Sequence, residues 1–361
     1  MDGQLYWDES AWYAFSLEQV ETDIEAAAEA VHELCLALVD EVAGSDELMR
    51  RLAIPPSARD YVAVSWRARE PSLYGRFDFA YDGVNPPKLY EYNADTPTSV
   101  FEAGVFQWLW LEDQIARGVL PAEADQFNSL HDKLLARWRT VAPGGGRMHF
   151  TAEAAAIEDR QTVRYLEDLA AQAGLSPKFV PVEQIGVTAQ GGFVDGDDED
   201  IRAIFKLHPW EDMLRLPYAE HLASSGAKFV EPPWKALLSN KGILPLLWER
   251  HRGHPNLLPA YFGHDVRRSE LGSSYVMKPL FSREGANILL VEDGRKDPVL
   301  DQGYGEEGRV VQALHPLPDF GGVYPVVGAW MVGDEPAGMG IREDTDRVTK
   351  NFSRFVPHAL V

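Results

Sequence analysis

Three oxygen-bearing side chains near residue 80, with an arginine beside them, have types and spacings that could bind a cation. Aromatic and polar residues alternate in two runs within residues 75–93, with Gly and Pro between them, which predicts a β-hairpin. Since strand residues two apart share a face, the hairpin would bring together Arg76, Asp78, Glu91 and Asn93. The three oxygen ligands suit Mg²⁺, which prefers a few carboxylates plus water and phosphate. Taken alone, the pattern also fits an antiparallel sheet face turned to solvent, with Arg76 and Asp78 as a surface ion pair.

Hydroxyl groups follow this hairpin directly. Thr96 and Ser99 stand at the start of a stretch, residues 99–118, whose apolar spacing predicts a helix. The free N–H groups of a helix start favour anions, so this segment could help to bind an anionic group. The two side chains would serve equally well as ordinary helix caps.

Two lysines lie in apolar surroundings. Lys241 stands between the apolar stretches 230–238 and 242–248, and Lys278 lies within a predicted strand over 275–280. Buried ammonium groups need anionic or hydrogen-bonding partners. A polar turn containing Arg283 follows Lys278, and such a strand-loop-strand unit could fold over phosphate groups. Each feature by itself also fits a hairpin with an ion pair at its tip.

Other chemistries have no motif to support them. No glycine-rich phosphate loop connects a strand to a helix, and no nucleophile elbow is present. His251 and His254 lack further His or Cys partners for zinc. Cys35 is the sole cysteine and lies among apolar helix residues, which predicts a buried thiol. The acidic run Asp195–Asp200 lacks the spacing of a calcium loop, and we expect a solvated hairpin tip there.

These residues must be positioned by a mixed α and β framework. Apolar spacing predicts helices over residues 17–42, 58–69, 128–141 and 158–173. Strands over 148–151 and 178–182 flank the last of these helices, which indicates an α/β layer near the middle of the chain. Beyond residue 275 the chain is predicted to be mostly β, with strands over 275–280, 288–292, 310–314, 326–332 and 337–342.

The overall charge restricts the class of partner. The chain has 361 residues, with 34 basic and 56 acidic side chains, so its formal net charge is −22. Such a charge repels a nucleic-acid backbone and an anionic membrane, and a small-molecule or cationic partner fits better. The start of the chain lacks a basic and then apolar leader, and no apolar run approaches 20 residues. We therefore expect a cytoplasmic protein that binds neither nucleic acid nor membrane; its oligomeric state stays open.

Taken in order, several segments resemble the synthetase domain of glutathionylspermidine synthase and its stand-alone acid–amine ligase relatives, an ATP-grasp type. The similar segments are 74–78, 89–95, 231–234, 239–245, 278–285 and 338–358. The resemblance implies an α+β or α/β, ATP-grasp-like fold with mixed and antiparallel sheets and helices packed around them. It also implies one composite unit over residues 1–361. Within it, 1–145 would form a helical scaffold with the Mg²⁺-binding hairpin, 146–230 a central α/β region and 231–361 the nucleotide-binding region.

The same resemblance implies roles for individual residues. Asp78, Glu91 and Asn93 would hold two Mg²⁺ ions, Arg76 would face an acyl phosphate, and Arg283 would lie on a mobile loop over the γ-phosphate. ATP would be bound by Lys241, Lys278, Gln312, Leu314 and Arg342. Thr96 and Ser99 would meet the acid substrate, and Glu158 and Asp159 would receive the amine. The last pair would also suit an ordinary acidic first helical turn.

The implied reaction is ATP-dependent amide formation through an acyl phosphate, with release of ADP and phosphate. The substrates would be a peptide-like or small carboxylic acid and an amine, with a polyamine among the candidates. Two alternatives stay open: a binding or regulatory protein that holds Mg²⁺-ATP without turnover, and a kinase that releases its phosphorylated product. The amidase half of the bifunctional synthase is missing, so hydrolysis of the conjugate is not expected. Pro97 would reshape the loop that meets the acid. The resemblance therefore does not establish that the acid is glutathione.

Overall fold

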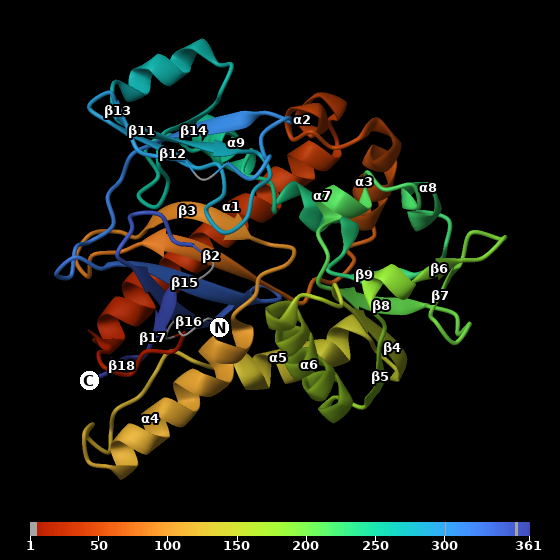
Figure 1. Cartoon of the computed structure of the whole chain (residues 1–361), viewed down its shortest axis with the longest axis horizontal. Coiled ribbons are helices and arrows are strands. Elements are labelled where there is room, and N and C mark those ends of the chain that lie inside the picture. Colours follow the sequence, from red (N-terminus) through yellow and green to blue (C-terminus); the bar gives the residue numbers. More distant parts are fainter. Residues whose placement is uncertain (1–5, 300, 351–352) are drawn as a thin grey trace.

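Three larger β-sheets form the framework of the computed structural model, which describes residues 6–299, 301–350 and 353–361. Figure 1 shows a central antiparallel sheet, a second antiparallel sheet beside it and a parallel sheet at the other side of the molecule. Helices pack around all three. The predicted combination of mixed and antiparallel sheets with surrounding helices is therefore confirmed.

The central sheet joins distant parts of the chain. Its strand order is β17-β16-β15-β2-β3, and every neighbouring pair is antiparallel. The predicted hairpin is confirmed as β2 and β3, with Asp78 opposite Glu91. One face of the sheet is apolar and packs with the long helix α1 (Ala26–Ala43) in the main core. The strands are β2 (Tyr74–Ala80), β3 (Lys88–Asn93), β15 (Tyr324–Val332), β16 (Glu335–Asp344) and β17 (Arg354–Val356).

The second sheet is built from the region after residue 260. Its order is β10-β14-β11-β12-β13, again antiparallel throughout. The strands are β10 (Ala260–Phe262), β11 (Tyr275–Pro279), β12 (Leu289–Glu292), β13 (Arg295–Lys296) and β14 (Arg309–Ala313). The predicted strands in this part of the chain are confirmed, whereas β10 and β13 were not predicted because they are too short to show a period.

The third sheet is parallel and corresponds to the predicted α/β layer. Its order is β5-β4-β8-β9. Helices α5 (Leu130–Val141) and α6 (Ile157–Gln172) bury their apolar sides against one face of it, where Trp138, Phe150 and Leu166 are fully buried. The strands are β4 (Gly146–Thr151), β5 (Leu175–Phe179), β8 (Ala203–Lys206) and β9 (Lys228–Val230).

The predicted helices are present, with shifted ends. The first begins as a π-helical segment at Gln19–Glu25 and continues as α1 (Ala26–Ala43), while the helix predicted from residue 99 begins with a π-helical segment at Glu102–Phe106. The other α-helices are α2 (Asp46–Arg51), α3 (Arg59–Arg67), α4 (Gln107–Ala116), α5 (Leu130–Val141), α6 (Ile157–Gln172), α7 (Trp210–Met213), α8 (Ala219–Leu222) and α9 (Ile243–Arg250). Cys35 is buried in α1, as expected.

Short pieces complete the chain. Strand β1 (Tyr13–Phe15) pairs in parallel with β18 (His358–Leu360), so the two end regions of the chain lie together. Strands β6 (Gly186–Val187) and β7 (Phe193–Val194) form a small hairpin. Short 3₁₀ turns lie at Pro56–Ala58, Val182–Gln184, Pro233–Leu237 and Val266–Leu271. No helix within the described ranges is both long enough and apolar enough to cross a bilayer.

One predicted strand lies earlier in the chain. Instead of residues 178–182, the strand is β5, which begins directly after Gly174 and pairs with β4. Pro177 within it is tolerated because β5 is an edge strand, where a missing N–H group leaves no neighbouring strand unpaired.

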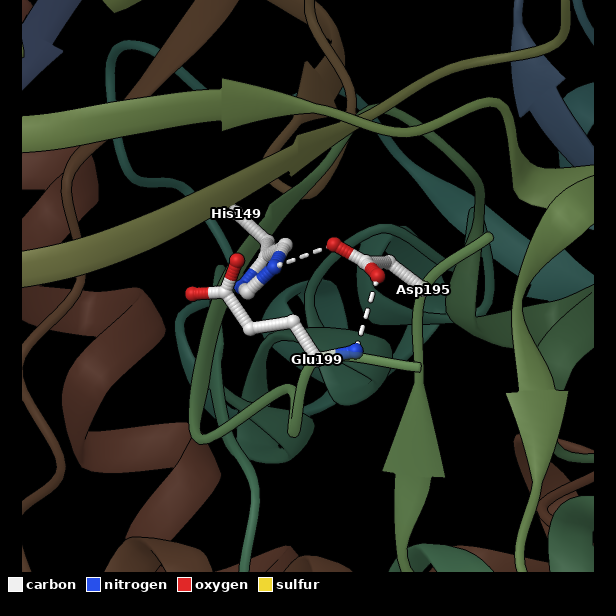
Figure 2. A group of neighbouring side chains, drawn as sticks. All are labelled: His149, Asp195 and Glu199. Atoms are coloured by element: carbon white, nitrogen blue, oxygen red, sulfur yellow. Dashed lines mark hydrogen bonds and ion pairs between the residues drawn. The ribbon is translucent and has the colours of Figure 1, made fainter. Parts of the chain in front are cut away.

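The expectation of a fully solvated tip at Asp195–Asp200 was wrong for its first residue. Asp195 is only 4% exposed, and its carboxylate lies 2.5 Å from the Lys178 ammonium and 3.2 Å from His149 Nε2. Figure 2 shows His149, Asp195 and Glu199 gathered in one cluster. Because Lys178 also lies 3.2 Å from Glu199, its ammonium balances these carboxylates. Gly196, Asp197 and Asp198 are exposed, as expected for a tip.

Candidate active site

The polar face of β2 and β3 carries an arginine held rigidly by a carboxylate. Arg76 donates to both oxygens of Asp78, at 2.6 and 3.0 Å, and to the carbonyl oxygen of Thr98 at 3.0 Å. Gly328 of the neighbouring strand makes room for it, because a Cβ there would lie 2.8 Å from Arg76 Cδ. Two parallel hydrogen bonds fix the guanidinium plane of Arg76, which lines the polar cavity described below.

The three predicted oxygen ligands converge. The Asn93 amide donates to an Asp78 oxygen at 3.1 Å and to a Glu91 oxygen at 3.3 Å. Asp78 and Glu91 each lie within hydrogen-bonding distance of the Asn93 amide, so two carboxylates and an amide gather at one place and form a donor set that fits Mg²⁺. Their gathering follows from the hairpin register, which places Asp78 opposite Glu91 and Arg76 opposite Asn93.

Both predicted lysines are buried beside this set. Lys241 precedes α9, and its ammonium lies 3.2 Å from Glu91 and donates to the Ser282 carbonyl oxygen at 2.8 Å. Lys278 of β11 donates to the Tyr90 carbonyl oxygen and to Gln312 Oε1, both at 2.9 Å. Glu91 of the hairpin therefore pairs directly with Lys241, while Lys278 of the second sheet bonds to the carbonyl oxygen of the neighbouring residue Tyr90.

These neighbouring charged groups change one another's pKa values. Burial alone would raise the pKa of Glu91, but the ammonium groups of Lys241 and Lys278 outweigh it and lower that pKa to about 2. Burial lowers the pKa of Lys278 to about 8, against the opposing effect of Glu91. Glu91 is thus a carboxylate across the physiological range, while Lys278 keeps its charge only up to slightly alkaline pH.

An apolar cavity adjoins these charges between the two antiparallel sheets. Gln312 of β14 and Leu314 line it, and Gln312 is held by a hydrogen bond from its Nε2 to the Leu89 carbonyl oxygen at 3.0 Å. Its apolar lining comes from Val276, Ile288, Leu290, Leu314, Leu317 and Val326. A flat apolar ring could enter here with its polar substituents directed to Lys241 and Lys278.

A polar cavity continues from the apolar one and shares Asp78, Glu91 and Lys241 in its lining. The loop after β11 covers it: Arg283 donates to the Thr96 hydroxyl at 3.1 Å and lies 3.9 Å from Glu211. Thr96 and Arg283, predicted from separate segments, are therefore in direct contact. The polar cavity is rich in groups that could bind an acid and a cation.

The two residues of the predicted acidic pair, Glu158 and Asp159, have different surroundings. Asp159 at the start of α6 lines the polar cavity, and burial raises its pKa to about 6. Glu158 lies outside the lining of the described cavities and accepts a hydrogen bond from the Tyr6 hydroxyl at 3.2 Å. Only Asp159 of the two therefore faces the space that a substrate could occupy.

Ser99 and Arg342 lie at the far side of Arg76. Both line a small cavity with Arg76 and Asp78, and Arg342 also lines the polar cavity. The Ser99 hydroxyl is buried, and Ser99 has a positive φ of 77°, a conformation that side-chain-bearing residues rarely adopt. Arg342 donates to the Lys350 carbonyl oxygen at 2.6 Å, so the C-terminal region contributes to this corner of the site.

Sequence reasoning missed several lining residues. Asp95 is 1% exposed and forms an ion pair of 2.5 Å with Lys206, although it stands in the segment that suggested the resemblance. Glu211, Ser282, Glu284 and Thr349 also line the polar cavity. Burial raises the pKa of Glu211, whose Oε2 is buried with no hydrogen-bond partner in the described part of the chain. The acidic pair after Trp210 offered a signal for Glu211, but the cavity it faces depends on the tertiary fold.

Comparison with known proteins gives this arrangement its context. The family model described as glutathionylspermidine synthase preATP-grasp matches residues 1–361. A Haemophilus influenzae protein provisionally named as an acid–amine ligase is 40% identical, over all of this chain and 92% of its own length. The bifunctional glutathionylspermidine synthetase/amidase of Escherichia coli is 27% identical over the whole chain, which spans only 61% of that protein.

A solved structure supports the fold independently of sequence. A glutathione synthetase-like effector from Globodera pallida superposes with a TM-score of 0.58, over 99% of this chain and 93% of its own, at 11% identity. The fold is thus ATP-grasp-like. Since a family model matches the full length and one relative is 40% identical, the chain belongs to the glutathionylspermidine synthase preATP-grasp family of ATP-dependent carbon–nitrogen ligases.

Proposed function

We propose that the protein joins a carboxylic acid to an amine through an acyl phosphate and releases ADP and phosphate. In this reaction the acid's carboxylate oxygen attacks the γ-phosphorus of ATP and the bond to ADP breaks. The amine then attacks the acyl carbon, phosphate leaves, and the amine loses a proton. We also propose that the chain works as one composite unit, because Arg76, Arg283 and Asp159 come from different regions yet line one cavity.

The observation that carries the proposal is the meeting of an apolar cavity, two buried ammonium groups and a hard-oxygen set at one place. The apolar cavity between the sheets would take the adenine, with Gln312 and Leu314 beside it. Lys241 and Lys278 would then contact the phosphates. Their positive charges attract phosphate locally, although the chain as a whole is negatively charged. Arg283 would complete the set from the loop above.

The oxygen ligands fit the cation that this family uses with ATP. Asp78, Glu91 and Asn93 would hold Mg²⁺, and we propose two ions. Bound there, Mg²⁺ would neutralise charge on the β- and γ-phosphates. Arg76, held by Asp78, would direct its free N–H groups to the acyl phosphate.

The polar cavity supports a peptide-like or small acid and a basic amine as the substrate classes. Thr96 in the polar cavity offers a hydroxyl group for the acid, and Ser99 offers a second one from the small cavity beside Arg76. Asp159 offers a buried carboxylate for the amine, with Glu158 behind it. A relative named glutathionylspermidine synthetase makes a thiol peptide and a polyamine reasonable first candidates.

A panel of acids and amines, scored by mass spectrometry with nucleotide analysis, tests this function. ADP, phosphate and a condensation product should appear only when acid and amine are both present. AMP and pyrophosphate would refute the acyl-phosphate route. A phosphorylated product formed regardless of amine would identify a kinase, and tight Mg²⁺-ATP binding without any product across the panel would favour a binding protein. Asp78→Asn should abolish turnover, while Asp113→Asn, a control at a half-exposed helix position, should retain it.

A further inference from the structure

A separate cavity lies on the parallel sheet, away from the proposed nucleotide site. It opens at the carboxyl ends of β4 and β8, where Thr151 and Lys206 are neighbours in register. Strand β5, which follows β4 in the chain, lies next to β4 on one side, whereas β8 and then β9 lie on the other side of β4. Such a reversal of strand order leaves a crevice, and ligands of open α/β sheets bind at this position.

The crevice is covered on the face opposite α5 and α6. Residues Thr151, Ile204 and Phe229 point to this face, because their neighbours in the strands point into the helical side of the core. The cover consists of the β6–β7 hairpin and residues near α7 and α8. The apolar walls are Val182, Ile185, Phe193, Ile204, Met213 and Phe229.

Four polar atoms of residues that line this cavity have no hydrogen-bond partner among the residues that the structure describes. They are Thr151 Oγ1, the Tyr218 hydroxyl and both ring nitrogens of His208, and each is buried from solvent. His208 Nδ1 comes no closer than 3.7 Å to a Glu153 oxygen. Buried polar groups are nearly always hydrogen-bonded, so a cluster that lines one apolar cavity indicates a molecule that bonds to them.

The charges around the cavity favour an uncharged ligand. Lys206 is the lining cation, but its ammonium is 2.5 Å from Asp95, which also accepts a hydrogen bond from the Trp210 backbone N–H. Burial lowers the pKa of His208, so its ring is neutral and offers one donor and one acceptor. An anion would find no free positive charge among the described residues of this lining, and an ammonium group would exchange its water shell for neutral partners.

We propose that this switch-point pocket binds a small uncharged molecule with an apolar body and one hydroxyl or amide group. The apolar walls would hold the body, while Thr151, His208 and Tyr218 would bond to the polar group. The pocket shares no lining residue with the apolar and polar cavities of the proposed active site. The Lys206–Asp95 ion pair separates it from the polar cavity, so a bound molecule would lie beside the substrates without meeting ATP.

Binding of p-cresol and toluene to the full chain, measured by calorimetry without ATP, tests the proposal. The two probes differ by one hydroxyl group. We expect p-cresol to bind with a dissociation constant of about 1 mM or tighter, and toluene roughly tenfold more weakly. Thr151→Val and Tyr218→Phe keep the shape of the cavity and should each weaken p-cresol binding by roughly 2- to 10-fold while leaving toluene unchanged.

The control is Thr140→Val, which changes an exposed threonine of α5 and should leave both affinities unchanged. Absence of p-cresol binding to the wild-type protein, equal affinity for the two probes, or insensitivity to both pocket variants would each overturn the proposal. Those results would mean that water alone bonds to the four polar atoms. Because no nucleotide or turnover is involved, failure here leaves the ligase proposal untouched, and the reverse also holds.

Discussion

Replacing Glu91 with glutamine removes the carboxylate that lies among the buried ammonium groups of the site. The substitution keeps the size of the side chain, but Lys241 would lose its partner at 3.2 Å. Lys278 would also lose the negative charge that favours its protonated form. We expect Glu91→Gln to destabilise the protein even in the absence of ATP and Mg²⁺, although removal of charged groups from functional sites often stabilises a fold.

The magnitude follows from the pKa of Glu91. Its folded-state pKa of about 2 lies about 2.5 below the ordinary value of 4.5, and each pKa unit corresponds to about 1.4 kcal/mol. The charged form therefore contributes about 3 kcal/mol to the free energy of unfolding at pH 7. Because the folded pKa is depressed, this stability is fully present above pH 4.5 and is lost as the pH falls toward 2. At pH 3.5 the difference between wild type and variant should shrink to about 2 kcal/mol.

Urea unfolding followed by tryptophan fluorescence and circular dichroism measures this difference, with coincident transitions as the test of two-state behaviour. The matched control is Glu335→Gln, in which an exposed carboxylate loses a surface ion pair with Lys133 and stability should change by less than about 0.5 kcal/mol. A Glu91→Gln variant that is as stable as the wild type at pH 7, or more stable, would refute this account of the site's electrostatics.

Three further predictions concern turnover and binding. Arg76→Lys keeps the charge but loses the two-pronged contact with Asp78, so kcat should fall roughly 100-fold with little change in the KM for ATP; steady-state kinetics with an unchanged kcat would contradict this. Since the pKa of Asp159 is about 6, the KM for the amine should fall roughly tenfold between pH 5 and pH 7 as this carboxylate ionises, and Asp159→Asn should flatten the profile. Since the pKa of Lys278 is about 8, the dissociation constant for ATP should rise as the pH increases above 8. Calorimetry with Lys278→Arg, which stays charged, should show that this rise has disappeared.

The sequence alone determined the local parts of the site. Alternation in the hairpin was sufficient to place Asp78 and Glu91 on one face, because a strand repeats every two residues and the intervening turn limits the register. The apolar neighbours of Lys241 and Lys278 were sufficient to predict that both are buried. These inferences rest on contacts between residues close in the chain, whose geometry is set by the backbone period.

Only the tertiary structure decided which distant groups meet. The contacts of Arg283 with Thr96 and of Lys206 with Asp95 join segments more than 100 residues apart, and no period or spacing in the chain encodes such contacts. The burial of Asp195 was likewise not predictable from the sequence, which placed this residue at a solvated tip. In the structure its carboxylate contacts Lys178 and His149. The sequence does not show whether water or a buried ammonium group stabilises the charge of a given carboxylate. The tertiary packing of the sheets determines which of the two surrounds it.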